Sequence, residues 1–94
     1  MRSQGATLSM IQARFQGRER SIARAFAENG SFRDLCDDYR KCASAVDRWQ
    51  RQKGKSAVSR RREYQELLEE LALEIRTWLD AMESASIHEN EREH

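Results

Sequence analysis

A run of basic residues is the clearest candidate for chemistry in this sequence. Between residues 48 and 62 the chain carries seven positive side chains and no acidic one. Guanidinium and ammonium groups at this density suit contacts with phosphate oxygens, as in helical proteins that brace against a nucleic-acid backbone. The members of this basic run, the candidate polyanion contacts, are Arg48, Arg51, Lys53, Lys55, Arg60, Arg61 and Arg62.

The same run has a second interpretation as a solvated turn. No aromatic residue stands between Trp49 and Tyr64 that could stack on a base. Residues 1–62 carry 15 Lys and Arg against 6 Asp and Glu, giving +9, whereas residues 63–94 carry 2 against 10, giving −8. The arginines could therefore pair with the acidic part of the same or another chain. Nucleic-acid binding is the alternative to this interpretation.

Catalytic and metal chemistry find little support in the residue pattern. The sequence has no nucleophile–base pair at a recognisable spacing and no glycine-rich phosphate loop, so we expect no catalytic residue and no cofactor. His88 and His94 lack a cysteine or histidine at ligand spacing, so we expect no metal site. Cys36 and Cys42 point about 120° apart on one helix and are expected to be buried free thiols.

Arg18 lies in a gap of an otherwise apolar stripe and is the one arginine placed to point inward. In length and helicity the chain is similar to three-helix chorismate mutases, in which arginines hold a substrate dicarboxylate inside a dimer. That resemblance implies a small all-helical enzyme with Arg18 as a substrate ligand, which is a further alternative. The structural alternative is an ion pair with an acidic residue of the next helix. The candidates for that pair are Asp37, Asp38 and Asp47.

Apolar periodicity predicts the helices that must position these residues. Apolar residues step by three and four along residues 32–52 and again along 57–83, which places one stripe on each of two helices. The sequence contains no proline that would interrupt them. The predicted interaction seam consists of Phe32, Leu35, Tyr39, Val46 and Trp49, with Cys42 at the same spacing, and of Tyr64, Leu68, Leu71, Ile75, Trp78 and Met82. Leu67, Ala72 and Leu79 widen the second stripe.

Matched stripes and a short connection predict an all-α fold built on an antiparallel, coiled-coil-like hairpin. A third helix over residues 6–29 packs across it, with Gly17 in its middle. Gly30 is expected to close that helix in the left-handed conformation, and Ser31 to cap the next one. The result is a three-helix bundle or a dimeric bundle of four or more helices. Leu73 falls on the outer face, where the first helix or a second chain could cover it.

The composition limits the domain organisation of the chain and the kinds of partner it can have. Residues 1–84 are expected to form one helical domain, and residues 85–94 an acidic, disordered tail. No apolar run of 18 residues is present, so we expect no membrane span, and the absence of a secretory signal predicts a cytoplasmic protein. Hydrophobic residues make up 38% of the chain, which is low for an isolated monomer. This favours a homodimer, or a complex with another helical protein.

The segment Phe32-x-x-Leu35-Cys36-x-Asp38-Tyr39, followed by Cys42 and Trp49, resembles a segment of small bacterial helical proteins. The resemblance covers about twenty residues. It implies a helical fold and no particular activity. Composition and periodicity together therefore predict a non-enzymatic protein–protein interaction module that self-associates.

Overall fold

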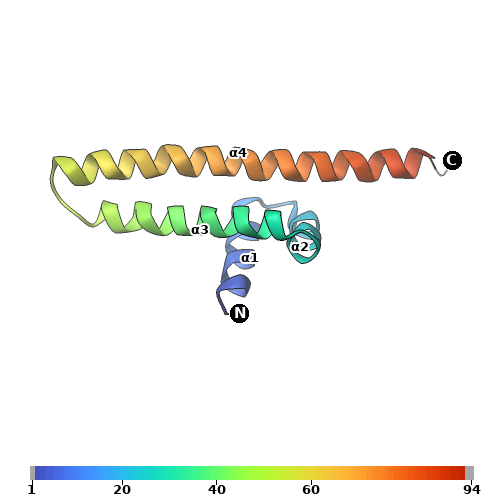
Figure 1. Cartoon of the computed structure of the whole chain (residues 1–94), viewed down its shortest axis with the longest axis horizontal. Helices are drawn as coiled ribbons and strands as arrows, with labels where there is room; N and C mark the ends of the chain where they lie inside the picture. The colour runs from blue at the N-terminus through green and yellow to red at the C-terminus, as the bar shows by residue number, and fades with distance from the viewer. Residues whose placement is uncertain (1, 93–94) are drawn as a thin grey trace.

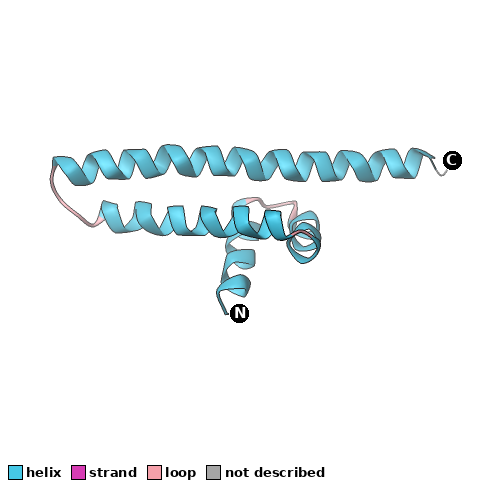
Figure 2. Cartoon of the chain, in the orientation of Figure 1, coloured by secondary structure: helices cyan, strands magenta, loops and turns pink. Residues whose placement is uncertain are grey.

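The chain forms four α-helices in the computed structural model, which describes the backbone of residues 2–92 and the side chains of residues 5–85. Helices α3 and α4 lie antiparallel, and α1 and α2 pack near the end of the hairpin opposite its turn (Figure 1). Only loops join the helices (Figure 2), and the molecule measures 61 × 26 × 21 Å. The predicted all-α class is confirmed. The bounds are α1 Arg2–Arg14, α2 Glu19–Glu28, α3 Gly30–Gln50 and α4 Lys55–Arg92.

The prediction of one N-terminal helix over residues 6–29 is wrong, because the chain turns a corner between α1 and α2. Gly17 has a φ of +91°, a left-handed conformation that costs glycine little and other residues more. The Glu19 carboxylate accepts a hydrogen bond from the Gly17 amide at 2.9 Å, and the Gln12 side chain donates to the Glu19 carbonyl at 3.1 Å. The glycine therefore marks a break in the helix, which lets α2 turn toward α4.

A single residue connects α2 to α3, and the predicted roles of Gly30 and Ser31 there are wrong. Asn29 is the cap, since its side-chain oxygen accepts a hydrogen bond from the Phe32 amide at 3.1 Å. Gly30 is the first residue of α3 and does not adopt a positive φ. Arg33 donates to the carbonyl of Phe26 at 2.8 Å, which satisfies one of the open acceptors at the end of α2.

The connection between α3 and α4 turns at Gly54, whose φ is +112°. Helix α3 ends at Gln50, and α4 begins at Lys55 and continues to Arg92. The predicted end of this last helix near residue 83 is therefore wrong, since α4 continues through residues 85–92; residues 93–94 of the predicted disordered tail lie outside the described residues. With 1.5 Å per residue, α4 is about 57 Å long and α3 about 32 Å. The C-terminal end of α4 consequently projects beyond the other helices (Figure 1).

The core lies between the hairpin and the two short helices. All five α3 stripe positions from Phe32 to Val46 are buried, as predicted, and Trp49 is half-buried. On α4 the buried stripe is rotated relative to the prediction. Leu79 is fully buried, whereas Trp78 is 37% exposed. The Trp78 and Phe32 rings meet edge to face, with their centroids 6.0 Å apart. The buried residues that complete this core are Ile11, Phe15, Ile22, Ala25, Phe26, Cys36, Ala72 and Ile75.

The reason for the rotation is the position of α2 and of the corner that precedes it. They pack on one side of α4 and draw Ala72 and Leu79 into the core, so the opposite side of the stripe turns outward. Leu73 lies farther around the helix and is 61% exposed. The first helix therefore does not cover Leu73, which excludes one of the two alternatives for this residue.

Candidate functional site

The two sides of the α4 stripe differ in what lies against them. On the covered flank, the Arg76 guanidinium lies 5.7 Å from the centre of the Phe15 ring, and Arg18 bonds to Asp80 and Glu83. We call the other side the open flank. Its residues follow at steps of three, four, three and four and are Tyr64, Leu67, Leu71, Glu74 and Trp78.

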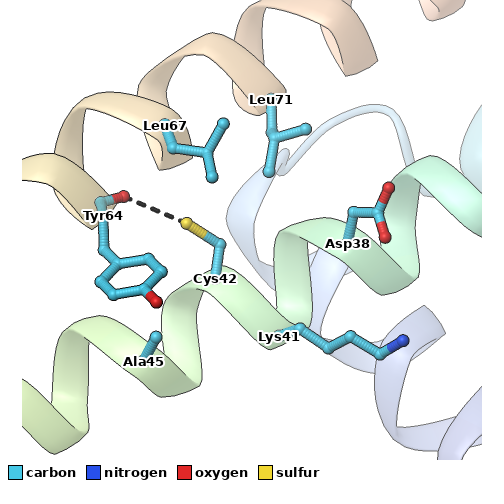
Figure 3. A pocket seen from close by; sticks show the side chains of 7 residues that line it. All are labelled: Asp38, Lys41, Cys42, Ala45, Tyr64, Leu67 and Leu71. Carbon is cyan, nitrogen blue, oxygen red and sulfur yellow. Dashed lines mark hydrogen bonds between the residues drawn. The ribbon is translucent and has the colours of Figure 1, made fainter.

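A groove of about 400 Å³ runs between the open flank and α3 (Figure 3). Leu67 and Leu71 project from α4 toward α3, and Cys42 projects from α3 between the helices. The Cys42 thiol donates a hydrogen bond to the Tyr64 carbonyl, with the sulfur 3.0 Å from the oxygen. The side chains that line the groove are those of Asp38, Lys41, Cys42, Ala45, Tyr64, Leu67 and Leu71. The lining is therefore mainly apolar, with one acidic and one basic side chain contributed by α3.

The thiols of the chain are poor nucleophiles in this setting. Cys36 and Cys42 are free and buried, as predicted. Burial, together with the charge of Asp37, raises the pKa of the Cys36 thiol to about 12, and burial also raises the pKa of the Cys42 thiol. Both thiols are protonated near neutral pH, and the thiolate is the reactive form. The groove therefore offers a partner apolar surface to bury and no reactive thiolate.

The structure gathers the basic run around the α3–α4 turn, as the hairpin prediction required. Arg51 pairs with Asp47 at 3.1 Å, and Arg60 with Glu63 at 3.6 Å. Lys53, Lys55 and Arg62 are exposed with no acidic partner in the described part of the chain, and Arg48 is exposed as well. Arg61 is half-buried, and its Nε is buried without a hydrogen-bond partner. We refer to residues 48–62 as the basic tip.

Arg18 does not pair with the aspartates predicted for it. Its guanidinium donates to Glu83 at 3.1 and 2.7 Å and also bonds to Asp80, and these two carboxylates raise its pKa. Asp37 instead pairs with Arg40. Arg18 therefore links the α1–α2 corner to α4. Its guanidinium, which would have to bind a dicarboxylate substrate, is already bonded to two carboxylates of its own chain.

Among residues whose placement is described, no three His, Cys, Asp or Glu side chains lie where they could hold a metal ion. Over the same part of the chain, no helix combines the length and the apolar character needed to cross a membrane.

Sequence reasoning identified the apolar residues of the site but not their division between two flanks. The sequence predicts that Leu71 and Trp78 lie within the seam and that Leu67 only widens it. In the structure all three side chains lie on the open flank. Their shared heptad spacing is visible in the sequence. Which flank would stay open depends on the corner at Gly17, which the periodicity does not show.

These features define a class of small all-helical protein built on a hairpin with one covered and one open flank. Comparisons with known protein families, with curated proteins and with solved structures find no match to this chain. Its function must therefore be inferred from the open flank, the groove and the basic tip.

Proposed function

We propose that the protein is a non-enzymatic helical interaction module that self-associates through the open flank of α4. The observation that supports this most directly is the apolar surface left beside the groove. Leu67 is 43% exposed and Trp78 37% exposed, although both belong to the stripe that elsewhere forms the core. Covering such side chains is favourable by about 25 cal/mol for each Å² of apolar surface removed from water.

A second copy of the chain suits this surface for a geometric reason. The open flank presents side chains at coiled-coil spacing, and the groove beside it is an apolar hollow that such side chains can enter. A two-fold symmetric interface uses the same patch on both partners, so one surface can provide both the projecting residues and the hollow. The chain therefore contains both halves of a complementary interface.

The length of the flank sets the expected strength of the complex. From Tyr64 to Trp78 the flank covers two heptads, or about 21 Å of helix. Association costs at least about 4 kcal/mol of lost rotational and translational freedom, and only the surplus appears as affinity. An interface of this length leaves a small surplus, so we expect a weak, concentration-dependent dimer.

Sedimentation at several micromolar concentrations tests the proposal. The unmodified chain should form dimers, and the double variant Leu67→Glu, Leu71→Glu should remain monomeric, because the new carboxylates would be buried unpaired at the interface. Leu73→Glu is a control, since it introduces one carboxylate at an exposed leucine that borders the open flank without belonging to it. A monomeric unmodified chain would exclude self-association, and disruption by Leu73→Glu alone would place the interface on another face.

A second candidate function is contact of the basic tip with a polyanion such as nucleic acid. It is favoured by the exposure of Lys53, Lys55 and Arg62, which have no acidic partner among the described side chains. Retention on a heparin resin near physiological salt would support it. Replacing the three residues by Gln should then make the negative slope of log affinity against log salt concentration less steep by about 3. Retention that is unchanged in this variant would argue against the tip as the contact.

A further inference from the structure

The distribution of charge along the molecule has a consequence for how two copies would align. The basic tip carries seven positive charges and lies at one end of the hairpin, whereas residues 80–92, at the other end of α4, carry four acidic residues and one arginine, a net charge of −3. The C-terminal end of α4 projects past the other helices (Figure 1). The two ends of the α4 rod therefore differ in sign and in what surrounds them.

We infer that two copies pair antiparallel along α4, so that the basic tip of each copy lies beside the acidic C-terminal part of α4 in the other. This inference rests on the proposed self-association. A parallel pair would place two basic tips side by side, within the screening length of about 10 Å at 0.1 M salt. The antiparallel pair replaces this repulsion with attraction at both ends of the interface.

The spacing of the open flank places the symmetry axis near Leu71. With the axis there, Leu71 faces its own counterpart, and Tyr64 of one copy lies opposite Trp78 of the other. The two rings can then pack together, as aromatic side chains favour. The same register sets residues 60–62 of one copy beside residues 80–82 of the other. It also sets the turn at residues 53–55 beside residues 87–89, within the projecting part of α4.

Distances between spin labels on paired copies can test the alignment. One label is attached at Val58→Cys in the basic tip and, in a separate sample, at Glu70→Cys near the axis. Both positions are exposed. The native thiols are buried and protonated at neutral pH, so attachment of one label per chain can be verified by mass spectrometry.

The expected result is a large difference between the two samples. Val58 is 13 residues from the axis, so two labels there should be separated by about 40 Å along the helices, whereas labels at Glu70 should be separated mainly by the distance across the pair. Equal, short distances at both positions would overturn the antiparallel alignment and leave self-association intact. The absence of any dipolar coupling at Glu70 would overturn self-association itself, and the alignment with it.

Discussion

The two flanks of α4 share one helix and one seven-residue period, yet they have different roles. The covered flank is closed by α2 and by the corner that contains Gly17, and its side chains are buried, paired with Arg18 or, for Arg76, set over the Phe15 ring. Among the described helices, α3 is the one that lies beside the open flank, and a groove remains between them. Burial on one side of a helix therefore stabilises the fold, and exposure on the other side leaves surface for a partner.

The largest expected contrast comes from the same substitution on each flank. Leu79→Ala removes a fully buried side chain, so the free energy of unfolding should fall by about 2–5 kcal/mol. Leu67→Ala removes a side chain that is 43% exposed, and in the monomer it should cost less than about 1.5 kcal/mol. Urea titrations at a concentration low enough to keep the chain monomeric provide the measurement. Equal losses would mean that the two flanks are not distinct.

The second contrast concerns the corner that closes the covered flank. Gly17→Ala should lower the free energy of unfolding by about 1–2 kcal/mol, because alanine is strained at a φ of +91° and no neighbouring atom would compensate. Gly5→Ala is the matched control. Gly5 lies inside α1 with open space around it, so alanine there should raise stability by up to about 1 kcal/mol. Thermal unfolding of both variants gives the sign. Stabilisation by Gly17→Ala would support the continuous helix expected from the sequence.

The same corner explains how far the fold could be predicted from the sequence. The repeat from Phe32 to Val46 has its apolar residues at regular spacing and no competing interruption, and every one of them is buried. Periodicity depends on the backbone of one helix, so it identifies a stripe well. It does not define the rotation of that stripe against its neighbours, which is why the spacing centres the stripe on Trp78 and gives Leu79 a place only at its edge, whereas Leu79 is the fully buried residue of the two.

The candidate site was less predictable because it depends on contacts between distant segments. The ion pairs between Arg18 and the acidic residues of α4 join positions more than 60 apart in the sequence, and nothing in the local pattern around Arg18 indicates them. The groove likewise exists because α2 lies on one flank and not on the other. Charge asymmetry and apolar spacing are visible in the sequence, but their arrangement in space also depends on the turns at Gly17 and Gly54.

Two neighbouring aspartates of α3, Asp37 and Asp38, should differ in how they affect the stability of the fold in acid. Asp37 accepts hydrogen bonds from Arg40 and from Thr7 of α1, and it pairs with Lys41. Burial acts to raise the pKa of Asp37, but these partners outweigh it and the pKa lies below its ordinary value. A depressed pKa stabilises the fold above the ordinary carboxyl range, and this contribution is lost as the pH falls below about 4.

Asp37→Asn should therefore reduce the loss of stability between pH 7 and pH 3, by less than about 1 kcal/mol because the carboxylate is partly exposed. Asp38→Asn is the control, since Asp38 is exposed at the groove and the described structure gives it no hydrogen bond or ion pair. Denaturant titrations at the two pH values measure the difference. An equal change in both variants would show that the contacts of Asp37 do not contribute.

The smallest expected effect is a difference between the alkylation rates of the two thiols. Cys36 is fully buried in the core, and Cys42 lies in the lining of the groove. Both should react slowly with iodoacetamide near neutral pH, because burial disfavours the thiolate, and Cys42 should react first because only α3 and α4 enclose it. If a second copy fills the groove, raising the protein concentration through the dimerisation range should slow Cys42 several-fold and leave Cys36 unchanged. Peptide mapping after timed alkylation reads both rates, and a Cys42 rate independent of concentration would show that the partner leaves the groove empty.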